Sequence, residues 1–255
     1  MILQVEVDGA TERSKRRRRE RAARILDAAA VSILRWGYDK TTIDDVARQA
    51  GVAKGTIYLH WKTRDDLFRA LIRRERLAVA GDLRRRVVED PEGATLRGML
   101  KHSALALLTR PLMKAILLRD LDVLGKLARR EPASATHAEA LAALAHYLEF
   151  LRERGLMRTD LDLPAQVSTL GAIFMGFFLI APLLPGEFSL SDEGRAELIA
   201  ETVHRALEPA RAFSPDELAA ASRAFLDYLD RETAIVWEAS EQENESDPLR
   251  SAHGE

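Results

Sequence analysis

The segment 42–61 carries hydroxyl, basic and aromatic side chains at spacings that suit contacts with DNA. Thr42 and Asp45 have the spacing of a capping box, in which a hydroxyl and a carboxylate satisfy the free amides at the start of a helix. Apolar residues then recur at helical spacing, and Gly51 stands where a left-handed residue would end the helix. In the second, shorter helix that follows, only Ile57 is clearly apolar. Such a helix gains little from burial, so its polar face indicates contact with a charged partner.

A set of short motifs at fixed spacing extends this pattern on both sides. In chain order the motifs are Trp36-Gly37-Tyr38, Thr41-Thr42, Ile43, Val46-Ala47, Ala50-Gly51-Val52, Gly55-Thr56-Ile57-Tyr58, His60-Trp61-Lys62, Asp65, Leu67 and Phe68. By these motifs the stretch 21–72 resembles the N-terminal DNA-binding domain of the TetR family of bacterial transcriptional regulators. Two positions depart from the family pattern. Ala53 stands where a Ser often caps the recognition helix, a loss of about 0.5–2 kcal/mol, and Leu59 replaces a frequent aromatic residue.

The resemblance and the polar face of the second helix together assign candidate DNA contacts. Thr56 and Tyr58 are expected to read bases, whereas Lys54, His60 and Lys62 are expected to contact phosphates. The full set of candidates in this segment is Thr41, Thr42, Lys54, Gly55, Thr56, Tyr58, His60 and Lys62.

A run of basic residues precedes this unit. It extends from Arg13 to Arg24 and includes Arg17, Arg18 and Arg19. We interpret residues 1–18 as a disordered basic arm that contacts phosphates or the minor groove. The alternative is a solvated tail that leads into the first helix.

The charge of the chain is distributed unevenly. Residues 1–75 hold 17 Lys and Arg against 11 Asp and Glu, whereas the remainder holds 21 against 29. A basic head on an acidic body favours nucleic acid at the N-terminal end only. The chain has no cysteine, which excludes disulfides and thiolate zinc sites and fits a reducing cytosol. The first residues lack the apolar run of a signal peptide, so a cytoplasmic location is expected.

Apolar periodicity and sparse Gly and Pro predict an all-α chain. The expected helices are 20–36, 42–50, 54–60, 63–86, 94–109, 111–130, 134–155, 164–183, 190–211 and 214–239. They give a three-helix DNA-binding head with a helix-turn-helix at 19–72, a larger helical effector-binding and dimerisation domain at 73–239, and an acidic disordered tail at 240–255. The helix at 63–86 is expected to be the only covalent link between head and body.

The stretch 164–186 contains no charged residue and is apolar on all sides in its middle. By length it could cross a membrane, but its prolines shorten the helix and no basic excess flanks it. In TetR-like proteins the corresponding helix contributes to a four-helix dimer interface. We therefore expect a buried interface helix without membrane contact, with Leu170, Phe178 and Leu179 at the interface of a homodimer.

The body also offers candidates for a small-molecule pocket. Side chains of Met, Phe and Leu usually form core, but this family holds an effector cavity in its body, and thioethers suit a pocket of variable shape. The candidates are Met99, His102, Met113, Leu117, Arg119, Asp120, Phe174 and Phe177. The effector is expected to be lipophilic, with Arg119, Asp120 or His102 as a polar anchor.

Catalytic and metal-binding patterns do not stand out. The six histidines are scattered, and Asp120 and Asp122 face different ways on a helix. We expect neither an enzyme nor a bound cofactor or metal. The sequence thus predicts a homodimeric repressor that binds a palindromic double-stranded DNA operator and releases it when a small effector binds. The alternatives are an effector-independent DNA-binding protein and a membrane-associated sensor.

Overall fold

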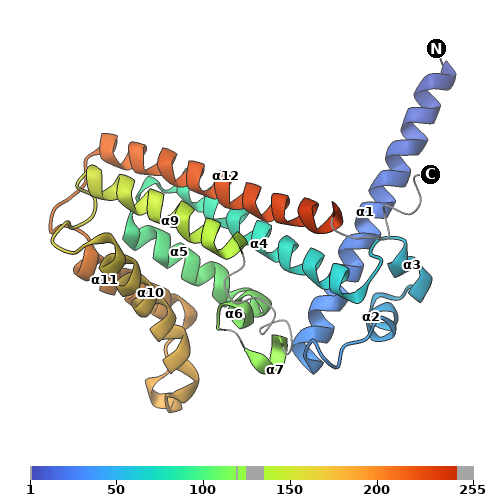
Figure 1. Cartoon of the computed structure of the whole chain (residues 1–255), viewed down its shortest axis with the longest axis horizontal. Helices are drawn as coiled ribbons and strands as arrows, with labels where there is room; N and C mark the ends of the chain where they lie inside the picture. The colour runs from blue at the N-terminus through green and yellow to red at the C-terminus, as the bar shows by residue number, and fades with distance from the viewer. Residues whose placement is uncertain (1, 119, 125–134, 246–255) are drawn as a thin grey trace. The chain divides into compact units, whose positions relative to one another are not determined.

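The computed structural model describes residues 2–118, 120–124 and 135–245, and within these ranges all regular secondary structure is helical (Figure 1). This confirms the expected all-α fold. The helices are α1 (Ile2–Trp36), α2 (Ile43–Ala50), α3 (Lys54–Tyr58), α4 (Arg64–Glu89), α5 (Leu96–Leu108), α6 (Pro111–Leu117), α7 (Leu121–Leu124), α9 (Ala135–Glu153), α10 (Leu163–Ile180), α11 (Asp192–Leu207) and α12 (Pro215–Glu245). Three 3₁₀ turns join some of them, at Pro91–Ala94, Ala181–Leu183 and Gly186–Phe188.

The chain divides into two compact units, which we call the head and the body. The head comprises Met1–Arg74 and Ala115–Arg130, and the body comprises Glu75–Lys114 and Glu131–Glu255. The chain therefore passes from the head to the body inside α4 and returns to the head inside α6. The expectation that the 63–86 helix is the only covalent link is wrong, because the segment 115–130 returns to the head.

The first helix is much longer than expected. It begins at Ile2 instead of Glu20, so residues 2–18 are helical and the prediction of a disordered arm at 1–18 is wrong. Lys, Arg, Glu and Ala are all good helix formers, and this stretch contains no proline. The Arg16 guanidinium and the Glu20 carboxylate also form an i,i+4 ion pair at 2.8 Å, which stabilises the exposed turn.

Two further boundaries differ from the expectations. The single helix expected at 111–130 is divided into α6 and α7, because the Asp120 carboxylate accepts the backbone amides of Asp122 and Val123 and so starts a new helix. At the other end, α12 continues to Glu245, so residues 240–245 are helical although we expected a disordered tail. Residues 246–255 lie outside the described residues.

The core of the head is formed by α1, α2, α3 and the start of α4. Its fully buried side chains include Ile25, Ile57, Leu67, Phe68 and Leu71. The expected cap of α4 is confirmed: the Thr63 amide donates to the Asp66 carboxylate at 2.9 Å, and the Asp66 amide donates to the Thr63 hydroxyl at 3.0 Å. The start of α4 thus completes the apolar core of the expected three-helix head.

The segment that returns to the head packs against the turn after α1. The backbone amide of Tyr38 donates to the carbonyl oxygen of Val123 at 2.8 Å. Gly37 has a φ of +77°, and a Cβ at this position would lie 2.4 Å from the Asp122 carbonyl oxygen. Glycine is therefore required at position 37 both for its backbone conformation and for the close approach of α7.

In the body, α5 packs along α11 and α9 packs along α12. The hydroxyl of Tyr147 on α9, which is almost fully buried, donates to the Ala94 carbonyl oxygen before α5. The Arg97 guanidinium forms an ion pair with Glu197 of α11 at 2.7 Å. These contacts tie helices that are distant in sequence into one unit.

Gly37 and Gly51 provide a matched pair that tests the contact with α7. Both glycines have positive φ, but a Cβ at Gly51 would meet no atom within 4 Å. Gly51→Ala should therefore lower the free energy of unfolding by only about 1–2 kcal/mol, which is the cost of a left-handed backbone at a residue with a side chain. Gly37→Ala should lower the free energy of unfolding by about 1–3 kcal/mol more than Gly51→Ala, because its methyl group overlaps the Asp122 carbonyl. Urea denaturation of the full chain measures both losses, and equal values would contradict the close packing of α7 on the head.

Candidate nucleic-acid interface and body cavity

The two caps expected around α2 are confirmed. The Thr42 hydroxyl accepts the Asp45 amide at 3.2 Å, and the Asp45 carboxylate accepts the Thr42 amide at 3.1 Å. At the other end Gly51 adopts a left-handed conformation with φ 64° and ψ 40°. The next amide, that of Val52, donates to the Ala47 carbonyl at 3.0 Å. Together these caps set the start of α2 and the direction of the turn that leads to α3.

Helix α3 has only five residues and presents most of its surface to solvent. Ile57 is its one buried side chain, and no side chain caps its start at Ala53. Tyr58 is 45% exposed and Leu59 is 72% exposed, while Thr56 is half-buried. A Cβ at Gly55 would meet no atom within 4 Å. This face therefore combines a hydroxyl and a phenol with an open backbone position that a DNA strand can approach closely.

Charged groups surround this face. The Lys54 ammonium donates to the Asp44 carboxylate at 2.9 Å, and both side chains are at least half exposed. This hydrogen bond raises the pKa of Lys54. Lys62 is also exposed. The bond to Asp44 holds the Lys54 ammonium beside the start of α3, where phosphate oxygens could replace the carboxylate.

His60 lies beside the basic residues of α1. Its ring packs on Trp61 at a centroid distance of 5.2 Å. Burial, and then the positive charges of Arg18 and Arg21, lower the pKa of His60 below its usual value. The side chains at 13–20, including Arg17, Arg18 and Arg19, are all exposed. The basic part of α1 therefore contributes positive charge beside the residues that follow α3.

One candidate DNA contact is contradicted by the structure. The side chain of Thr41 is fully buried, and its hydroxyl donates to the Gly37 carbonyl oxygen at 2.8 Å. It stabilises the turn after α1 and does not reach the surface. The neighbouring Thr42 is exposed, so the pair Thr41-Thr42 provides one internal contact and one surface contact.

Behind this surface, Tyr38 connects the parts of the head. Its ring packs edge-on against Phe68 at 4.9 Å, and its hydroxyl donates to the Asp65 carboxylate. The Arg64 guanidinium lies over the ring at 4.4 Å and donates to the Thr41 carbonyl at 3.1 Å. Burial, followed by the bond to Asp65, raises the pKa of Tyr38. These contacts fix the turn after α1 and the start of α4 around the buried side of the surface.

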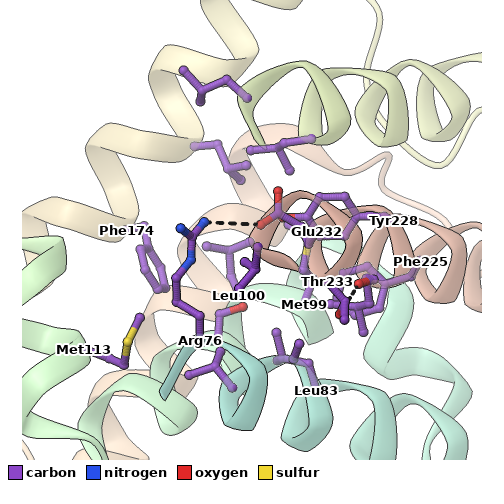
Figure 2. A pocket seen from close by; sticks show the side chains of 18 of the residues that line it. Arg76, Leu83, Met99, Leu100, Met113, Phe174, Phe225, Tyr228, Glu232 and Thr233 are labelled. Atoms are coloured by element: carbon purple, nitrogen blue, oxygen red, sulfur yellow. Dashed lines mark hydrogen bonds and ion pairs between the residues drawn. The ribbon is translucent and has the colours of Figure 1, made fainter. Parts of the chain in front are cut away.

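The body contains a cavity of about 390 Å³ lined mainly by apolar side chains (Figure 2). Three of the expected pocket residues, Met99, Met113 and Phe174, line it. His102 and Phe177 do not line it, and Leu117 and Asp120 belong to the head. Asp120 instead caps α7, as described above, and Arg119 lies outside the described residues. Three of the eight expected residues therefore line the cavity, and four others lie elsewhere in the chain.

Sequence reasoning missed the charged residues of this cavity. Arg76 of α4 and Glu232 of α12 both line it, and their Nη2 and Oε2 atoms lie 3.9 Å apart. Figure 2 shows the two side chains reaching toward one another from opposite helices. Each lies on a long helix rich in charged residues, so the ion pair between α4 and α12 is what distinguishes the two.

The apolar helix α10 has two different faces. Leu170, which lines the cavity, and Phe178 are buried within the chain, so the expectation that these two side chains lie in a subunit interface is wrong. Leu179 and Ile180 are 52% and 45% exposed, and Leu183 of the following turn is 75% exposed. Leu163–Leu183 is also long and apolar enough to span a membrane. The exposed face is thus the part that a partner would cover.

Residues 25–71 match the family model of the bacterial regulatory proteins of the tetR family. This range contains α2, α3, both caps and most of the head core described above. The head therefore carries a DNA-binding domain of the TetR family. TetR-family proteins are DNA-binding transcriptional regulators.

Curated relatives of this chain match it in the head. The chain is 38% identical over 58 residues to the fatty acid metabolism regulator protein of Bacillus subtilis, and 37% identical over 60 residues to the regulator TtgR of Pseudomonas putida. These matches cover 23% and 24% of this chain. They span 30% and 29% of the two relatives, so less than a third of the length of either protein is matched.

Solved structures extend the similarity to the body at the level of the fold. The regulator SCO4942 of Streptomyces coelicolor has a TM-score of 0.56 at 17% identity, over 73% of this chain and 98% of that one. SmeT, the repressor of the Stenotrophomonas maltophilia multidrug efflux pump SmeDEF, has a TM-score of 0.53 at 23% identity, over 76% and 93%. SmeT has also been solved in complex with triclosan, at a TM-score of 0.51, 19% identity and coverage of 77% and 95%.

The lowered pKa of His60 predicts that DNA binding by this head depends on pH. A phosphate beside the imidazole favours its charged form, so DNA should raise the pKa and binding should take up a proton. Operator affinity should therefore increase as the pH falls from 8 to 6, by up to about tenfold for each unit by which the phosphate raises the pKa.

Fluorescence anisotropy across this pH range, at constant salt, measures the effect. His60 is the only histidine in the sequence 1–74, so His60→Gln should flatten the dependence. A wild-type profile as flat as that of the variant would exclude a phosphate contact by His60.

Proposed function

We propose that this TetR-family regulator is a repressor that binds a palindromic operator as a homodimer and releases it when a small, lipophilic effector fills the body cavity. The observation that carries the proposal is the exposed polar face of α3, with Thr56, Gly55 and Tyr58 beside two groups of basic residues. In this proposal residues 19–72 bind DNA, residues 73–239 bind the effector and form the dimer, and the protein acts in the cytoplasm.

The contacts to DNA follow from the chemistry of the α3 face. Thr56 and Tyr58 can donate and accept hydrogen bonds at base edges in the major groove. Lys54, His60 and Lys62 contact the phosphates, joined by the exposed Arg17, Arg18 and Arg19 of α1. Phosphate contacts fix the register of α3 on the duplex, and base contacts select the sequence.

A palindromic operator has two equivalent half-sites, so the proposal requires a dimer with one recognition helix for each half-site. Two recognition helices must lie about 34–36 Å apart to enter successive major grooves. The exposed apolar face of α10 and the adjoining turn, at Leu179, Ile180 and Leu183, supports a subunit interface. A small residue also favours close approach, since a Cβ at Gly176 would meet no atom within 4 Å.

Helix α4 supports the proposed coupling between effector and DNA. Arg74 forms an ion pair with Asp27 of α1 at 2.7 Å, and two residues later Arg76 lines the cavity, followed by Leu77 and Ala80. One helix thus contributes side chains to the head core region and to the wall of the cavity. An effector that favours one conformation of the body lowers operator affinity in proportion to its preference for that state.

The membrane-associated sensor receives less support. One face of α10 lines the cavity and packs inside the body, and its start is tied by polar contacts. The buried Gln166 amide donates to the Arg158 carbonyl, and the Arg152 guanidinium donates to Gln166. A membrane span would present apolar side chains to lipid on the whole circumference. The other alternative, an effector-independent regulator, would have the same DNA-binding head but would bind no effector in the cavity.

Substitution of Thr56 tests the assignment of base reading. After bound genomic fragments have been selected to define an operator, Thr56→Ala should reduce the ratio of operator to scrambled-DNA affinity. A good base contact contributes about 1–3 kcal/mol of discrimination. The control is Lys62→Ala, which should weaken both DNAs by a similar factor. Equal ratios for wild type and Thr56→Ala would remove Thr56 from the base contacts.

Substitution on the exposed face of α10 tests the dimer. Leu179→Glu places a charge in the proposed interface, where it lacks a partner and costs several kcal/mol of desolvation. We expect a monomer by size-exclusion chromatography with light scattering, together with weaker operator binding. Val88→Glu on α4 is the control, because Val88 is also exposed, at 67%, and lies outside the proposed interface. A dimeric Leu179→Glu protein with full affinity would place the interface elsewhere.

A further inference from the structure

The ion pair of Arg76 and Glu232 is unusual for its surroundings. The cavity has an apolar wall formed by residues such as Leu83, Leu100, Met113 and Phe174, and the side chains of Arg76 and Glu232 are only 33% and 19% exposed. Removing two charges from water is costly, and their mutual attraction repays this only when the geometry is close. At 3.9 Å the two atoms are farther apart than in a direct hydrogen bond. Attraction within the pair is therefore a poor explanation of why both charges line this wall.

The spacing of the pair does suit a third polar atom. One oxygen can lie at an ordinary hydrogen-bond distance of about 2.8 Å from both Nη2 of Arg76 and Oε2 of Glu232. Such an oxygen must accept from the guanidinium and donate to the carboxylate. A hydroxyl does both at once. An amide does the same with two atoms, since its carbonyl accepts and its N–H donates.

The same geometry disfavours a ligand with a single charge. A carboxylate bound to Arg76 would lie close to Glu232, and an ammonium bound to Glu232 would lie close to Arg76. In either case the cavity would hold one uncompensated charge in an apolar environment, which is costly. A neutral group leaves the net charge of the pair unchanged.

The other polar groups that line the cavity do not change its net charge. Thr233 donates its hydroxyl hydrogen to the Leu229 carbonyl at 2.8 Å, and Ser103 is uncharged. Burial raises the pKa of Tyr228 above its usual value, so its phenol is neutral. Among the described residues that line the cavity, Arg76 has the only basic side chain and Glu232 has the only carboxyl group.

We propose that the cavity selects an uncharged amphiphile with one donor–acceptor group, such as a hydroxyl, a phenol or an amide. This group bridges Arg76 and Glu232, and the hydrocarbon part of the molecule packs on the apolar wall. The volume of about 390 Å³ lies toward the lower end of small-molecule sites, which favours one compact chain or ring system. The inference rests on the proposed function only in taking this cavity as the ligand site.

Three probes of equal chain length test the selection. They are 1-decanol, decanoate and decylammonium, each titrated at neutral pH and submicellar concentration into the full-length protein by calorimetry. We expect decanol to bind with a Kd at least about tenfold lower than that of either ion. An ion that binds as tightly as decanol would overturn the selection of a neutral group, and the pocket assignment would stand. Failure of all three probes to bind would overturn both.

Variants that change the charge of the pair should reverse the ranking. Glu232→Gln leaves Arg76 alone and should make decanoate the tightest of the three probes. Arg76→Gln removes the positive charge of the pair and should make decylammonium the tightest of the three probes. The exchanged pair, Arg76→Glu with Glu232→Arg, keeps the site neutral and should keep decanol first. An unchanged ranking in both folded single variants would contradict the proposal, and the wild-type ranking tests it independently if a single variant does not fold.

Operator binding measured with the same probes separates the two proposals. If decanol binds through the pair and also weakens operator binding, both are supported. If decanol binds with the expected ranking but leaves operator affinity unchanged, the ligand class is supported and the effector role is contradicted.

Discussion

A helix of five residues has no stability of its own, and the proposed reading of DNA by this protein depends on that constraint. Isolated helices shorter than about 12–15 residues are marginal in water, and α3 also lacks a side-chain cap. Its position is therefore imposed from outside, by burial of Ile57 in the head core and by the left-handed turn at Gly51. Tyr38, held by Asp65, Arg64 and Phe68, gives this core a rigid far side. The exposed face of α3 can consist of polar residues because the rest of the head supplies its stability.

The head could be predicted from sequence because its determinants are local. The capping box at Thr42, the left-handed Gly51 and the cap at Thr63 each depend on residues within a few positions of one another, and each was confirmed. The errors in the head have a different origin. Whether Thr41 points inward, and whether α7 packs on Gly37, depends on contacts over a longer range that periodicity does not record.

The body was harder to predict because its site is formed by distant segments. Met99, Met113 and Phe174 were found because apolar side chains suit a cavity. Arg76 and Glu232 were missed because a charged residue on a helix is ordinarily solvated, and nothing within either helix indicates that the two face one another. Similarly, an all-apolar α10 does not reveal which of its faces packs inward, so Phe178 and Leu170 were assigned to the wrong side.

The continuous helix α1 limits how much charge the basic segment can deliver to DNA. Successive residues of a helix point about 100° apart, so the four residues Arg16 to Arg19, all exposed, are distributed around the whole circumference. A flexible arm could turn every guanidinium toward the backbone, whereas a rod can direct only about half of them there. Each phosphate neutralised releases about 0.9 of a condensed cation. The dependence of log DNA affinity on log salt concentration that this segment contributes should therefore correspond to about half of its arginines. The remaining arginines are available to another ligand or partner on the opposite side of the helix.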